Sequence, residues 1–214
     1  MNETLARRFT GTAGVAAAAA LILEVPLYFV YSGAPPDSNI LSRLLVGIFS
    51  MGFLLVLVTG LREIIKTVHP EYEWAGTLAF AAGLAYTTIT LVSHGLEAGD
   101  VIATEQPIDP TITVHGTYIL YGSISRMLLA LFLTALGYAI ARTGALPRWT
   151  SRSAYVLAAV NIAFVPSLFF GNTPANFYAA NGWGTTALMG AVLSYWLLAM
   201  GITTLRSART ARAR

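Results

Sequence analysis

The chain has 214 residues, of which 56% are hydrophobic and 11% are charged, with a net charge of +3 and no cysteine. A soluble domain has roughly 25% charged residues, so this balance excludes an ordinary soluble protein and indicates a polytopic membrane protein. The lack of cysteine excludes disulfides, thiolate metal sites, CxxC redox chemistry and covalently attached c-type haem.

Apolar runs of about 20 residues, the length that crosses a bilayer as a helix, recur along the whole chain. We therefore predict an all-α fold, a single transmembrane domain over residues 1–214 with six membrane-spanning helices. The expected spans are 9–31, 40–66, 74–97, 113–142, 151–170 and 182–206. We do not expect the first span to be a signal peptide, because its apolar stretch is too long and contains Glu24 and Pro26.

The basic residues predict the orientation. If the N-terminus is cytoplasmic, all 13 lysines and arginines except Arg43 and Arg126 belong to the cytoplasmic side. The loops on the other side contain no lysine or arginine, and they carry Asp37, Asp100, Glu105 and Asp109. The positive-inside rule then predicts that both termini are cytoplasmic. Because topology places the positive charge, we expect the lipid bilayer as partner and no nucleic acid. The excess of arginine over lysine, with many alanines and glycines, is typical of a bacterial protein and predicts the plasma membrane as its location.

Three charged residues are predicted to lie at one depth. Counted from the basic residue at the cytoplasmic end of the same span, Glu24 and Arg126 are each sixteen residues away and Arg43 is nineteen. At 1.5 Å per residue these separations are about 24 and 28 Å, within a hydrocarbon core about 30 Å thick. His94 belongs to the same outer layer, because it is twenty residues from Trp74, or about 30 Å. Charged residues inside a span are costly, so they are candidates for function.

The polar residues of this layer share helix faces, which predicts an outward-opening polar pocket in the outer half of the bundle. Residues three, four or seven positions apart lie on one helix face. The stripes are Glu24, Tyr28 and Tyr31 on the first span, Arg43 on the second, His94 and Glu97 on the third, and His115 and Arg126 on the fourth.

The leading hypothesis is a small membrane-embedded enzyme or binding protein that acts on a lipophilic molecule, such as an isoprenoid or a lipid, by acid–base chemistry. Glu24 is the expected general acid or electrostatic anchor, and His94 its proton partner. The expected substrate contacts are Arg43 and Arg126, which hold an anionic or polar head, together with Tyr28, Tyr31, Glu97 and His115.

Two other classes of protein remain open. An ion pair of Glu24 with Arg43 or with Arg126 would suit a structural or regulatory membrane partner without a ligand. A small-solute or proton-coupled transporter would need polar residues that continue toward the cytoplasmic side, where Ser50 and Asn161 offer little.

No cofactor is expected, although two alternatives can be formulated. His94, Glu97 and His115 are suitable ligands for a divalent metal, and His94 and His115 could hold a haem between two helix ends. Neither spacing is specific.

Four segments carry a resemblance to a known family: "LARRFTGTAGVAAAAALILE" (5–24), "GLREIIK" (60–66), "GYAIARTGALPRWTSR" (137–152) and "SYWLLAMGI" (194–202). The chain resembles an uncharacterised family of six-helix bacterial membrane proteins over essentially its whole length, with "TGALPRW" (143–149) as the most specific element. The resemblance implies six helices and cytoplasmic termini. It implies no activity and no catalytic residues.

Overall fold

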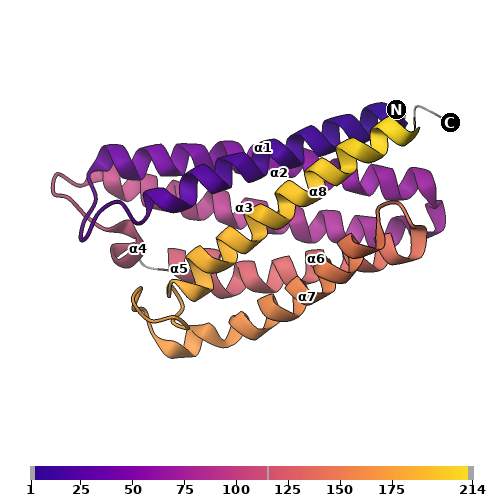
Figure 1. Ribbon diagram of the computed structural model, residues 1–214. Helices are drawn as coiled ribbons and strands as arrows, with labels where there is room; N and C mark the ends of the chain where they lie inside the picture. Colours follow the sequence, from indigo (N-terminus) through magenta and orange to yellow (C-terminus); the bar gives the residue numbers. More distant parts are fainter. Residues whose placement is uncertain (1–2, 115, 212–214) are drawn as a thin grey trace.

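The protein is an all-α bundle in a computed structural model, which describes residues 3–114 and 116–211. Six helical segments are long and apolar enough to cross a membrane, which confirms the predicted fold class and number of spans. The long helices are α1 (Glu3–Leu27), α2 (Asp37–Val68), α3 (Glu73–Ala103), α6 (Ser125–Thr143), α7 (Arg148–Phe164) and α8 (Met189–Ala211) (Figure 1). Shorter helical turns connect or extend them: η1 (Pro70–Tyr72), α4 (Pro110–Thr113), α5 (Thr117–Ile119), η2 (Leu120–Ile124), η3 (Val165–Phe170) and η4 (Gly184–Leu188).

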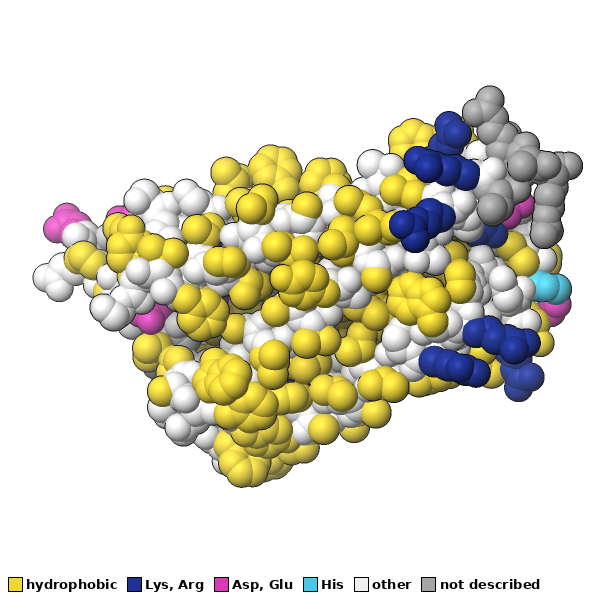
Figure 2. All heavy atoms as spheres, viewed as in Figure 1, with side chains coloured by type: hydrophobic (Ala, Val, Ile, Leu, Met, Phe, Trp, Pro, Cys, Tyr) yellow, Lys and Arg dark blue, Asp and Glu magenta, His cyan; other side chains and the backbone are white. Residues whose placement is uncertain are grey.

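The two ends of the bundle differ in charge. The beginning of α1 and the end of α8 lie at the same end in Figure 1, and lysines and arginines gather there in Figure 2. We call this the basic end; Lys66, Arg142 and Arg209 lie there in the last turns of α2, α6 and α8, and Arg148 begins α7. We call the opposite end the acidic end, because Asp37 begins α2 there and Asp109 precedes α4.

The surface between the two ends is apolar. Phe9, Leu23, Val156 and Tyr195 have exposed fractions of 60%, 66%, 63% and 63%. Hydrophobic side chains cover the middle of the bundle in Figure 2. Such a surface is suited to lipid contact, because the hydrocarbon core of a bilayer solvates apolar side chains.

Helices α1 and α8 cross closely near the basic end because glycines remove side chains from the crossing. A Cβ added to Gly201 would lie 2.7 Å from the backbone nitrogen of Val15 and 2.9 Å from the carbonyl oxygen of Gly11. Small residues allow such backbone contact between membrane helices. The two helices diverge toward the acidic end in Figure 1. There a Cβ on Gly190 of α8 would have only one neighbour within 4 Å among the described residues, Val25 Cγ2 of α1 at 3.9 Å.

The basic half of the bundle has a closed apolar core. Leu57 of α2, Leu133 and Leu136 of α6, and Leu197 and Met200 of α8 are each at most 1% exposed. These side chains exclude water from the centre of the bundle on that side.

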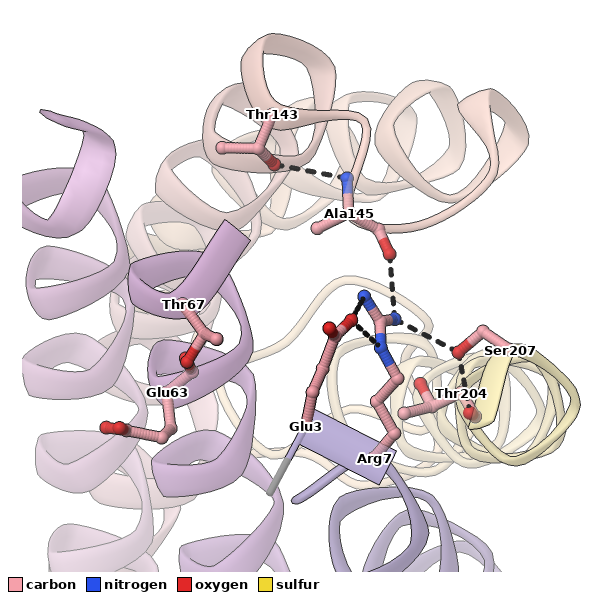
Figure 3. A network of polar contacts seen from close by, with 8 residues as sticks. All are labelled: Glu3, Arg7, Glu63, Thr67, Thr143, Ala145, Thr204 and Ser207. Carbon is pink, nitrogen blue, oxygen red and sulfur yellow. Dashed lines mark hydrogen bonds and ion pairs between the residues drawn. The ribbon is translucent and has the colours of Figure 1, made fainter. Parts of the chain in front are cut away.

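Arg7 ties three segments together at the basic end (Figure 3). Its side chain is 6% exposed, and its Nε and Nη2 both contact Glu3 Oε1 at 2.9 Å. Its Nη1 donates to the carbonyl oxygen of Ala145 at 3.0 Å and to Ser207 Oγ at 3.1 Å. Arg7 of α1 thereby links α8 to the turn between α6 and α7.

Three predicted boundaries were wrong. Helix α1 ends at Leu27 and not at residue 31, directly after Pro26, which cannot donate a backbone hydrogen bond. Helix α3 continues to Ala103, so the long connector expected after residue 97 is shorter. The fourth span begins at Thr117 and not at residue 113, because Gly116 has a φ of 86°, a left-handed conformation that interrupts a helix.

Candidate functional site

A cavity of about 270 Å³ lies in the acidic half of the bundle. Its lining includes polar side chains, among them Glu24, His94, Glu97 and Arg126, which we call the polar wall, and apolar side chains, among them Leu21, Val25, Phe29, Met51 and Ala187, which we call the apolar wall. Helices α1, α2, α3 and α6 and the turn η4 contribute side chains, and Gly190 of α8 contributes backbone. The cavity is therefore amphipathic, and we call it the main cavity.

Glu24 and His94 form the closest pair of ionisable groups in the polar wall. Their side chains come from α1 and α3, are 6% and 7% exposed, and approach to 3.8 Å between Glu24 Oε1 and His94 Nε2. This distance is too long for a direct hydrogen bond, so the two side chains face each other without bonding. Glu24 Oε2 and His94 Nδ1 have no hydrogen-bond partner among the described residues.

Gly47 of α2 lets these two side chains approach. A Cβ at this position would lie 2.5 Å from His94 Cε1 and 3.0 Å from Glu24 Oε2. Both groups therefore pack against bare backbone, and any side chain at position 47 would have to displace the imidazole ring. Gly47 fixes where the acid and the imidazole meet.

Glu97 lies one helical turn beyond His94 on α3, as the i, i+3 spacing predicts. It is 2% exposed, and its Oε2 has no hydrogen-bond partner within the described part of the chain. Two carboxyl groups and one imidazole thus share one wall of the main cavity.

Arg126 begins α6 and completes the polar wall. It is 4% exposed, and its Nη1 donates to Asn161 Oδ1 at 3.5 Å and its Nη2 to the carbonyl oxygen of Tyr121 at 3.4 Å. Both hydrogen bonds are longer than the usual range of about 2.7–3.2 Å. The Nε has no partner among the residues that the structure describes. The guanidinium is loosely held and faces no carboxylate.

Arg43 does not line the main cavity, although it belongs to the same layer. It is 2% exposed and lines a second cavity of about 120 Å³. Its Cζ lies 4.1 Å from the ring centroid of Tyr28, a cation–π contact. Tyr28, Asp109 and Thr111 line both cavities, so the two adjoin. We call the second one the head cavity.

The expected ion pair of Glu24 with Arg43 or Arg126 is not formed. Among the described residues, the only ion pair that Glu24 forms within 4 Å is the one with His94. Neither arginine forms an ion pair there. Equal depth brings the groups to one layer, but the side chains point into different spaces.

The other predicted contacts have mixed outcomes. Tyr28 lines both cavities, whereas Tyr31 lies beyond the end of α1, is 48% exposed and lines the head cavity alone. His115 lies outside the described residues. Within the described ranges, no three His, Asp or Glu side chains come together as metal ligands. The metal and haem alternatives that involve His115 stay predictions.

The lining residues that the sequence prediction missed include Tyr121, Asp109, Asn181 and Trp183. Tyr121 lies in the π-helical turn η2, where Gly122 departs from helical geometry. A π turn adds a residue, so Tyr121 and Arg126 share a face although five positions separate them. Asn181 and Trp183 come from the loop between η3 and η4, whose fold a helical periodicity does not predict. The one sequence signal for this irregular turn is Gly122, the residue after Tyr121.

Comparisons of the chain with protein-family models, with curated proteins and with solved structures find no match. The function is therefore inferred from the geometry and chemistry of the two cavities.

Proposed function

We propose that this membrane protein binds a small lipophilic molecule in the main cavity and acts on it by acid–base chemistry. The observation that carries the proposal is an amphipathic cavity in which buried ionisable groups lack partners from the chain itself. At about 270 Å³, the cavity is close to the lower limit of about 300 Å³ for small-molecule sites.

The unpartnered atoms support a ligand more than a structural role. Buried polar atoms in native proteins are nearly always hydrogen-bonded, and exceptions mark functional sites. Here Glu24 Oε2, His94 Nδ1, Glu97 Oε2 and Arg126 Nε are all unpartnered among the described residues. Groups that only hold helices together would bond to one another. The reading as a structural partner without a ligand is therefore the less supported one.

Glu24 and His94 supply the chemistry in this proposal. A protonated Glu24 donates its proton to a double bond or an oxygen of the bound molecule, and neutral His94 removes a proton from another position of it. The two side chains then move from their separation of 3.8 Å to hydrogen-bond distance, and His94 returns the proton to Glu24. The apolar wall excludes water, which strengthens the electrostatic interactions inside the cavity.

The bound molecule enters from the bilayer between α1 and α8 in this proposal. The backbones of these helices contact each other at Gly11 and Gly201, and the helices diverge toward the cavity (Figure 1). Val25 of α1, Ala187 of η4 and Gly190 of α8 line the cavity at this divergence. All three are small or apolar, as a passage for a lipophilic molecule requires.

A transporter is less well supported. Solute transport would need a polar route from the main cavity to the basic end, but below Leu21 and Met51 the core residues Leu54, Leu133 and Leu136 are at most 3% exposed. These side chains close the bundle in the observed conformation.

We further propose that the protein lies in a bacterial plasma membrane with its basic end in the cytoplasm. The positive-inside rule supports this orientation, because the basic residues gather at the end where α1 begins and α8 ends. The resemblance to the uncharacterised bacterial family supports the same origin. The cavities then open toward the outer leaflet.

The proposal is tested by replacing Glu24 with glutamine. We expect Glu24→Gln to keep its folded yield in dodecyl maltoside and to lose stabilisation by farnesol and decanol, measured as the shift of the thermal unfolding midpoint. Glu63→Gln, at the basic end of α2, is the matched control and keeps the stabilisation. The proposal fails if wild-type protein is not stabilised by either probe, or if Glu24→Gln abolishes folding while no probe ever binds.

A further inference from the structure

The head cavity is a compartment beside the main cavity, with a different character. At about 120 Å³ it is less than half as large, and its polar lining includes Tyr28, Tyr31, Arg43, Asp109 and Thr111. Tyr28, Asp109 and Thr111 line both cavities, so the two compartments adjoin.

Arg43 in the head cavity is a buried cation with no carboxylate oxygen within 4 Å among the described residues; Glu24 and Glu97 interact with it only at longer range. Its Nε and Nη2 have no hydrogen-bond partner among the described residues, and no carboxylate there lies within ion-pair distance. The face of Tyr28 at 4.1 Å offers a partial negative charge but no hydrogen-bond acceptor in line with these atoms. A buried, unpaired charge is strongly unfavourable. A water molecule can accept one hydrogen bond here, but it does not neutralise the charge.

We propose that the ligand of the main cavity is an amphiphile with an acidic head group, and that Arg43 binds this head in the head cavity. The inference rests on the proposed function, because it assigns the head of the molecule whose chain occupies the main cavity. A carboxylate or phosphate suits the guanidinium, since Nε and Nη2 form one edge of its fork and can donate two parallel hydrogen bonds.

The rest of the head cavity fits such a group. The Tyr31 hydroxyl is a donor that an acidic head can accept from. Asp109 also lines the cavity, but its Oδ1 is already engaged by the backbone nitrogen of Thr111 at 3.1 Å and by the Thr111 hydroxyl at 2.7 Å. That carboxylate is turned to capping α4, and a hydroxyl on the head group would satisfy its remaining oxygen.

The test compares probes that share one chain and differ in the head. Apparent affinities come from the thermal unfolding midpoint of the full-length protein in dodecyl maltoside as a function of probe concentration. The probes are decyl phosphate, decanoate, decanol and decylamine, and inorganic phosphate serves as a head group without a chain. We expect decyl phosphate or decanoate to bind at least about tenfold more tightly than decanol, as charge-assisted hydrogen bonds predict. The stronger of the two identifies the head.

Variants locate the effect. Arg43→Gln should bind all four decyl probes with the affinity that the wild type has for decanol. Arg43→Lys should keep part of the preference for acidic heads, because it keeps the charge. Arg62→Gln, on the same helix but at the basic end, should bind like the wild type. The midpoint of each variant without probe shows whether it is folded, and the wild-type comparison of heads stands even if Arg43→Gln is not.

The outcomes separate the two proposals. Equal affinity for decanol and the acidic probes, tighter binding of decylamine, or an acidic preference that survives in Arg43→Gln overturns the acidic head and leaves the lipophilic cavity intact. Binding of inorganic phosphate as tight as that of decyl phosphate shows that the site is one for a free anion and overturns the amphiphile. If no chain binds, the proposed function itself fails.

Discussion

Three buried arginines of this protein have very different surroundings at the two ends of the bundle. Arg7 at the basic end, 6% exposed, donates to Glu3, Ala145 and Ser207 (Figure 3). Arg43 and Arg126 near the acidic end are 2% and 4% exposed, yet each has a guanidinium nitrogen without a partner among the described residues. The same side chain is thus satisfied in one place and unsatisfied in two others.

The difference separates a structural role from a binding role. A buried cation that stabilises a fold needs partners from the fold, and Arg7 has them. Arg43 Nε and Nη2 lack such partners among the described residues, and Arg126 has only two long hydrogen bonds, to Asn161 and Tyr121. Both arginines line cavities that a molecule can occupy. Depth in the membrane alone does not distinguish these cases, but hydrogen bonding does.

The glycines of the two ends show a similar contrast. Gly201 at the basic half contacts the backbone of α1, whereas Gly47 near the acidic end contacts the side chains of His94 and Glu24. The first contact positions a helix and the second positions two ionisable groups. Substitutions at these glycines should therefore have different consequences.

The largest effect is expected for Gly201→Ala. The new methyl group would lie 2.7 Å from the backbone nitrogen of Val15, so α1 and α8 must move apart. Overpacking of this kind costs about 1–3 kcal/mol, which lowers the thermal unfolding midpoint by about 3–10 °C. Circular dichroism during heating measures the shift. Gly190→Ala on the same helix, where there is space, should melt like the wild type, and equal midpoints of all three proteins would contradict the close crossing.

Gly47→Ala should affect binding more than stability. Its methyl group would lie 2.5 Å from His94 Cε1, so the ring must swing away from Glu24. We expect the apparent affinity for farnesol to fall about tenfold, with a midpoint shift smaller than that of Gly201→Ala. Gly52→Ala, on the same helix with nothing within 4 Å among the described residues, is the control. Unchanged affinity for farnesol in Gly47→Ala would contradict binding of the ligand at the Glu24–His94 pair.

The smallest effect on stability is expected for Gly190→Phe, which fills the space between α1 and α8 without displacing backbone. The free energy of unfolding should change by less than about 0.5 kcal/mol, as for sites without close neighbours. Binding of decanol should be lost, because the ring occupies the passage and part of the main cavity. Retention of both the affinity and the rate of binding would show that the molecule enters elsewhere.

The sequence was sufficient for the architecture and for the layer of polar residues. Hydropathy and charge are properties of local sequence, and the rise of an α-helix converts residue counts into depth. Glu24, His94 and Arg126 were therefore predicted to lie in one layer, with Glu97 one turn beyond His94, and all four line the main cavity. The i, i+3 spacing of His94 and Glu97 survived because α3 is regular through both residues.

The remaining features depend on tertiary structure or on irregular helices. Arg43 was expected to face the same pocket, but stacking on Tyr28 turns it into the head cavity. Tyr31 left the predicted stripe because α1 ends at Leu27. Tyr121 joined the site through a π-helical turn, and no regular period predicts that phase change.

The most direct measurement compares the thermal unfolding midpoints of Arg7→Met and Arg43→Met without added ligand. Arg7→Met leaves the carbonyl of Ala145 and the carboxylate of Glu3 without their donor. Its midpoint should fall by about 3–10 °C, as expected for the loss of about 1–3 kcal/mol. Arg43→Met removes an unpaired buried charge at similar volume, so its midpoint should stay the same or rise. If Arg43→Met is destabilised as much as Arg7→Met, Arg43 has partners in the fold, and the polar layer at the acidic end is structural.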